Sequence, residues 1–83
     1  MPNFSNLAVQ QRRVLRFKVR SYNRLIKKTN RIIGKLEIRY HEVENESQMR
    51  NHIILMLNIT RHALNDMQNK RDALFSRLIA LYD

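Results

Sequence analysis

The feature that most constrains the fold is a run of residues spaced alternately four and three apart, from Leu15 to Val43. Residues three and four apart share one face of an α-helix, so the run predicts a long helix with a continuous packing seam. Such a seam must be buried against another helix. All members except Thr29 are apolar or aromatic: the first seam consists of Leu15, Val19, Tyr22, Ile26, Thr29, Ile33, Leu36, Tyr40 and Val43.

A second run with the same spacing follows a short polar stretch. The stretch, residues 42–48, reads EVENESQ and predicts a turn at about 44–48, with Ser47 as a candidate helix N-cap. We therefore expect helices at about 7–43 and about 49–82. The second seam consists of Ile53, Leu57, Thr60, Leu64, Met67, Arg71, Leu74, Leu78 and Leu81.

Two long helices joined by a short turn form an antiparallel hairpin. The sequence thus predicts an all-α protein, an antiparallel two-helix coiled-coil hairpin in a single domain over 1–83. With the turn near residue 46, facing positions have numbers that sum to about 93, which places Arg71 opposite Tyr22 for stacking on its ring. Leu25 and Ile32 widen the first seam, which favours assembly into a four-helix bundle or a larger helical complex. One uninterrupted helix per chain, forming an extended coiled coil, is the alternative.

Apolar residues away from the seams are expected to gather at the two ends of the hairpin. Two helices bury only one face each, and clustered exposed apolar residues indicate a protein–protein interface. We expect these residues to dock partner helices, from a second copy or from other helical proteins. The turn-end patch contains Ile38, Ile54 and Leu55, the patch at the chain ends contains Val14, Phe17, Phe75 and Ile79, and Ile59 also points away from the seam.

The positive charge is confined to the first half of the chain. Residues 1–36 contain ten Lys or Arg and no acid, whereas residues 37–83 contain six bases and seven acids, giving the net charge of +9. This asymmetry predicts a polyanionic or acidic partner. The cations opposite the first seam form a stripe about 33 Å long, at 1.5 Å per residue. We call the following residues the basic stripe: Arg13, Arg20, Arg24, Lys27, Lys28, Arg31 and Lys35.

An Arg-rich, acid-poor N-terminus is also typical of a mitochondrial presequence. Here the basic residues are interleaved with the first seam, whereas a cleavable presequence would precede the fold. No apolar run of membrane-spanning length and no signal-peptide core occurs in the sequence. We therefore expect an intracellular protein without a membrane span, in the nucleus, the cytoplasm or the mitochondrion.

No residue pattern for catalysis or metal binding is apparent. The three histidines, His41, His52 and His62, are not three or four apart, and the chain has no Cys and a single Gly. We therefore expect no enzymatic activity, no cofactor, no metal and no small-molecule substrate. The favoured function is a small basic assembly or adaptor subunit that docks helical proteins. The alternative is a nucleic-acid-binding protein that contacts the phosphate backbone of DNA or RNA through the basic stripe.

Overall fold

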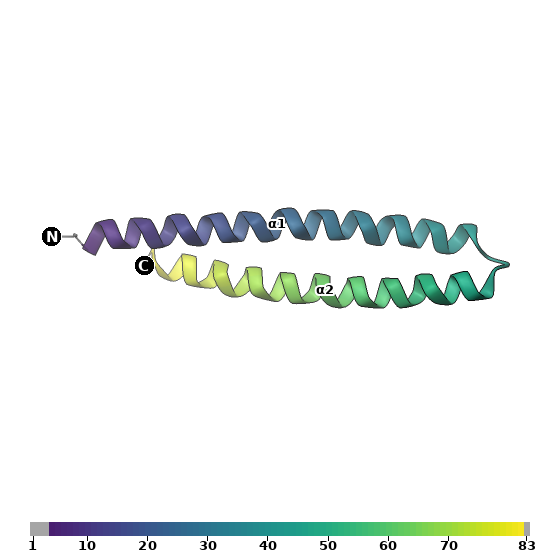
Figure 1. Ribbon diagram of the computed structural model, residues 1–83. Helices are drawn as coiled ribbons and strands as arrows, with labels where there is room; N and C mark the ends of the chain where they lie inside the picture. Colours follow the sequence, from purple (N-terminus) through teal and green to yellow (C-terminus); the bar gives the residue numbers. More distant parts are fainter. Residues whose placement is uncertain (1–3, 83) are drawn as a thin grey trace.

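Two long helices lie side by side and run in opposite directions (Figure 1). The computed structural model describes residues 4–82, with helix α1 at Phe4–Glu42 and helix α2 at Ser47–Ala80. The molecule measures 68 × 18 × 14 Å. The all-α hairpin expected from the two seams is confirmed. The alternative of one uninterrupted helix is wrong, because the chain reverses between Glu42 and Ser47.

The contact between the helices is made by the two seams. Every seam residue on both helices is buried or half-buried, because steps of four and three keep one stripe of each helix turned to the other. The best-packed region lies near the turn, where Ile33, Val43, Ile53 and Leu57 form one buried cluster. Burial of these apolar side chains holds the helices together, because each Å² of apolar surface removed from water contributes about 25 cal/mol of favourable free energy.

The turn occupies residues 43–46 and is closed by backbone hydrogen bonds. The amide of Val43 donates to the Arg39 carbonyl at 3.2 Å, and the amide of Glu46 donates to the Val43 carbonyl at 3.1 Å. The N-cap of α2 is Glu46, whose side chain makes no capping hydrogen bond, so the expected N-cap Ser47 is instead the first residue of the helix.

Helix α1 begins at Phe4, earlier than expected. The apolar spacing weakens before Leu15 because the preceding seam position is Arg12. In the structure, the Arg12 guanidinium lies over the Tyr82 ring, 4.8 Å from its centroid. A long arginine side chain can therefore occupy a half-buried seam position and stack its planar end on an aromatic ring.

Gly34 is the only glycine in the chain and lies inside α1. A methyl group built on its Cα would meet no atom within 4 Å. Within this hairpin, no other backbone therefore lies so close to Gly34 that a glycine is required there.

Candidate interaction surfaces

The hairpin has two long sides, which the contacts across the seam distinguish. On one side, which we call the Arg61 side, Arg61 Nη2 forms an ion pair with Glu37 Oε1 at 3.0 Å. On the other, which we call the Leu25 side, Arg39 Nη2 lies 3.7 Å from Met49 Sδ. Residues that stand whole heptads from these markers share their sides, because a coiled-coil position recurs every seven residues.

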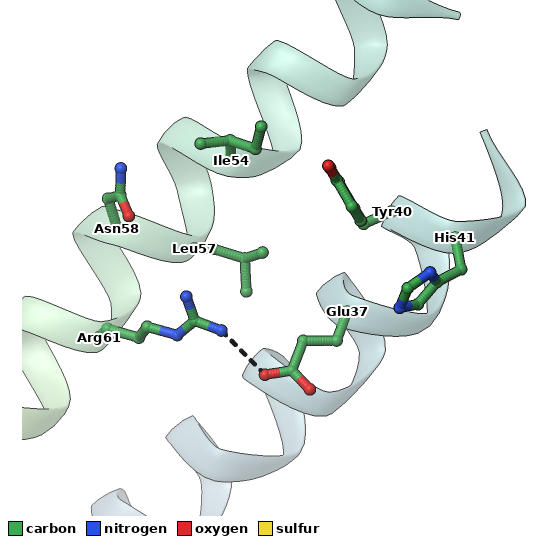
Figure 2. A pocket seen from close by; sticks show the side chains of 7 residues that line it. All are labelled: Glu37, Tyr40, His41, Ile54, Leu57, Asn58 and Arg61. Atoms are coloured by element: carbon green, nitrogen blue, oxygen red, sulfur yellow. Dashed lines mark hydrogen bonds and ion pairs between the residues drawn. The ribbon is translucent and has the colours of Figure 1, made fainter. Parts of the chain in front are cut away.

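A hollow of about 440 Å³ lies on the Arg61 side (Figure 2). Glu37 and Arg61 point toward one another across it from α1 and α2, while His41 of α1 and Asn58 of α2 stand at its edges. The ion pair is about half exposed at both partners, so solvent and salt weaken it. Tyr40 also lines the hollow, and its ring lies edge-on to the His41 ring with 5.6 Å between the ring centroids.

Two further hollows lie on the Leu25 side, toward the end of the hairpin where α1 begins and α2 ends. Their volumes are about 510 Å³ and about 420 Å³. Lys18 lines both, so they are neighbours along α1. The first is lined by Leu7, Gln10, Gln11, Val14, Leu15, Lys18, Arg77, Ala80 and Leu81, and the second by Phe17, Lys18, Ser21, Tyr22, Leu25 and Leu74.

The patch expected at the chain ends is not one surface. Val14 and Phe17 border the hollows on the Leu25 side, whereas Phe75 and Ile79 line neither. Phe75 stands two heptads from Arg61 and therefore lies on the Arg61 side. Residue numbers that sum to 93 specify the level along the hairpin but not the side, so the expected cluster is divided between opposite sides.

The turn-end patch is divided as well. Ile54 lines the hollow on the Arg61 side, and Ile38 does not. Ile38 stands three heptads from Phe17 on the outer face of α1, and Leu55 follows Ile54 on the outer face of α2. All eight residues expected to dock partner helices are exposed: Val14, Phe17, Ile38, Ile54, Leu55, Ile59, Phe75 and Ile79. Their role in docking stays a prediction.

The basic stripe lies on the outer face of α1, and all seven of its side chains are exposed. The four ion pairs found within residues 4–82 involve other cations, namely Arg39, Arg61, Lys70 and Arg71. At whole-heptad spacing along the centre of this face lie Phe17, Arg24, Arg31 and Ile38. Arg24 and Arg31, at the centre of this face, thus lie between Phe17 and Ile38, which are 67% and 62% exposed.

The exposed ion pair between Lys70 and Asp66 changes the titration of Lys70. Lys70 Nζ lies 2.9 Å from Asp66 Oδ2, one turn away on α2. The hydrogen bond to the Asp66 carboxylate, together with its negative charge, raises the pKa of Lys70 above its ordinary value, and Tyr22 adds to the effect.

The described part of the chain, residues 4–82, holds no group of three or more His, Cys, Asp or Glu side chains placed to share a metal ion. Within the same residues, neither helix combines the length and the apolar character needed to cross a membrane.

Several exposed apolar residues on the Leu25 side are absent from the predicted docking set. Leu7, Leu25, Ile32 and Met56 are 39–50% exposed and lie outside both seams. A signal for the α1 members is present in the sequence, because Leu7, Gln11, Val14, Lys18, Ser21 and Leu25 again follow steps of four and three. Half of the members of this second run are polar, so it is easy to overlook beside the first seam.

Comparison with known proteins adds no relative: no protein-family model, no curated protein and no solved structure matches the chain.

Proposed function

We propose that this chain is a non-enzymatic assembly subunit that docks helices of a second copy, or of other helical proteins, onto its exposed apolar side chains. The basic stripe adds attraction to an acidic partner. In this function the seams only hold the hairpin together, and the outward faces of both helices carry the interaction.

The observation that carries the proposal is the imbalance between exposed and buried apolar residues. Among the described residues, fifteen large apolar side chains stay exposed and eight apolar side chains are buried. No large side chain of the described part is fully buried. A chain of 83 residues arranged as two helices has only a small core, and assembly is a common way to add buried apolar surface. Burial of these exposed side chains against partner helices would supply the missing apolar contact.

The test is light scattering on the purified chain, repeated for variants at Leu55 and Phe75. Both side chains are about half exposed, so a change to asparagine should leave the hairpin folded. We expect a discrete oligomer for the wild type and its loss in Leu55→Asn together with Phe75→Asn. Charge reversal of Arg24, Lys27 and Arg31 should leave that oligomer intact. A wild type that remains monomeric, with no change of state in either variant set, would contradict assembly through these surfaces.

A second candidate function, backbone-directed nucleic-acid binding, is favoured by the exposed stripe of unneutralised cations. Its length of about 33 Å is close to one turn of duplex DNA, so several phosphates could be contacted together. Charge reversal of Arg24, Lys27 and Arg31 would then abolish binding to a short mixed-sequence duplex and flatten its salt dependence. If the chain is an assembly subunit, it should not bind the duplex at moderate salt. One titration of the chain with the duplex therefore distinguishes the two candidate functions.

A further inference from the structure

The two hollows on the Leu25 side form one groove along the seam, which we call the open-end groove. Lys18 is common to both hollows, and their α1 residues extend from Leu7 to Leu25. At 1.5 Å per residue α1 lines about 27 Å of the groove, and the facing residues from Leu74 to Leu81 line about 10 Å of its opposite side. Straight walls of this kind match the ridge of a third helix laid along the seam.

The walls of the groove are largely apolar. Leu7, Val14 and Leu25 are 46–54% exposed and Phe17 is 67% exposed, while Ala80 supplies a small residue on α2. Side chains of this size that lie together in a hollow favour burial under a partner rather than contact with water. The occupant must therefore present an apolar stripe.

The charge of the groove determines the rest of the partner's chemistry. Lys18 lines both hollows and Arg77 lines the larger one, and no carboxylate of residues 4–82 lines either. The hollow on the Arg61 side differs in this respect, because Glu37 neutralises Arg61 there. A partner that carries acidic residues beside its apolar stripe would pair with Lys18 and Arg77, and a basic partner would be repelled.

We propose that the open-end groove binds an acidic amphipathic helix of another protein, which would lie along the seam as the third helix of a bundle. A helix of about 18 residues fills the length of the groove. The inference rests on the proposed function, because it identifies one docking face of the assembly subunit and the chemistry of its partner. A second copy of this chain does not fit as the occupant, since two copies joined through the groove would bring their Lys18 and Arg77 side chains together.

The experiment uses the full chain and a designed, fluorescently labelled peptide of about 18 residues, the length of the groove. The acidic probe has leucine at every third or fourth position and glutamate on both flanks, and its basic twin has lysine in place of every glutamate. Fluorescence anisotropy measures binding of each probe. We expect the acidic probe to bind, with an affinity that weakens as salt is added, and the basic twin not to bind.

Matched variants locate the binding site. Val14→Asn and Lys18→Glu change the groove, whereas Val9→Asn and Arg16→Glu make the same changes on exposed residues of the Arg61 side. Each groove variant should weaken binding of the acidic probe by about tenfold, and each control should change it less than about twofold. Circular dichroism should show the same helix content in all four variants, because none of these residues belongs to a seam.

Three results would overturn the inference: equal binding of the basic twin, equal losses in the groove and control variants, or no binding of the acidic probe. A homodimer that Val14→Asn dissociates would also overturn it, because the occupant would then be a second copy. Leu55 and Phe75 lie outside the groove, so the light-scattering test of assembly does not depend on it. If only the probe-binding test fails, the groove inference is wrong and the proposed function still stands. If the light-scattering test fails as well, both are wrong.

Discussion

The guanidinium of Arg50 lies 4.3 Å from the centroid of the Tyr40 ring, and its Nη1 donates to the Glu44 carbonyl at 3.3 Å. One side chain from the first turn of α2 thus contacts the last turn of α1 and the loop between them. Its Nε is buried without a hydrogen-bond partner, so the flat face on the ring and the Nη1 hydrogen bond are its stabilising contacts.

Replacement of Arg50 by lysine should loosen this end of the hairpin. Lysine keeps the charge but lacks the planar group that stacks on Tyr40 and reaches the Glu44 carbonyl at the same time. We expect Arg50→Lys to lower the free energy of unfolding by about 1 kcal/mol in urea denaturation. Arg61→Lys is the control, because its contact with Glu37 is a half-exposed ion pair that lysine can also make. Equal losses in the two variants would contradict a special role for Arg50.

Gly34→Ala should stabilise the protein. The added methyl group meets no atom within 4 Å, and alanine favours a helix interior over glycine by about 1 kcal/mol. A higher melting temperature, followed by circular dichroism, checks this expectation. Ala63→Gly, at an exposed position of α2, should lower stability by a similar amount. A loss of stability in Gly34→Ala would mean that this position contacts a partner in the folded assembly.

Thr29→Val is expected to raise stability by about 1 kcal/mol. Thr29 is buried in the seam, and its hydroxyl donates to the Leu25 carbonyl of its own helix at 2.7 Å. The hydroxyl proton is therefore used within α1 and does not hydrogen-bond the backbone of α2. Valine has the same branched shape and adds apolar surface to the seam. The Thr60 hydroxyl likewise donates to the Met56 carbonyl, but Thr60 is less buried, so Thr60→Val should raise stability less. A destabilised Thr29→Val would show that the contact of the hydroxyl with Met67 Sδ at 3.7 Å matters more than its apolar burial.

Alkaline pH should weaken the contact between Lys70 and Asp66. The carboxylate raises the pKa of Lys70 in the folded protein, so the stabilisation is complete below the ordinary lysine pKa and is lost as pH rises through the raised pKa. NMR titration of the Lys70 side chain should place its pKa above the ordinary value for lysine. Asp66→Asn should return the pKa of Lys70 toward its ordinary value. An unchanged titration in that variant would contradict the assigned cause.

The helical hairpin could be predicted because one periodicity determines it. The steps of four and three assigned every seam residue to the buried stripe, including polar Thr29, whose hydroxyl is satisfied within its own helix. The exact ends of the helices could not be predicted. No glycine or proline marks the turn, and a backbone hydrogen bond rather than a Ser47 cap closes it.

The side faces were harder to predict than the seams. Val14 and Ile79 are level with one another along the hairpin, because their numbers sum to 93, but the side on which each lies depends on the helical angle, which a sum of residue numbers does not contain. The stacking expected between Arg71 and Tyr22 was also misplaced. Arg71 contacts Asn23 and Asp72 instead, at 3.3 Å and 3.0 Å, because acceptors that hydrogen-bond a guanidinium compete with an aromatic ring. Within residues 4–82, the arginines found over tyrosine rings are Arg12 and Arg50.

Helix α1 begins and α2 ends at the same end of the hairpin (Figure 1), which determines how the molecule resists mechanical force. A pull that separates the two chain ends loads the seam one layer at a time, beginning at Arg12 and Tyr82 and advancing toward the buried cluster of Ile33 and Ile53. A pull between the turn and a chain end acts along the backbone of one helix, so it stretches that helix and does not load the seam. A partner helix held in the open-end groove would cover the layers that open first, so its release would let the hairpin unzip from its free end under a smaller force.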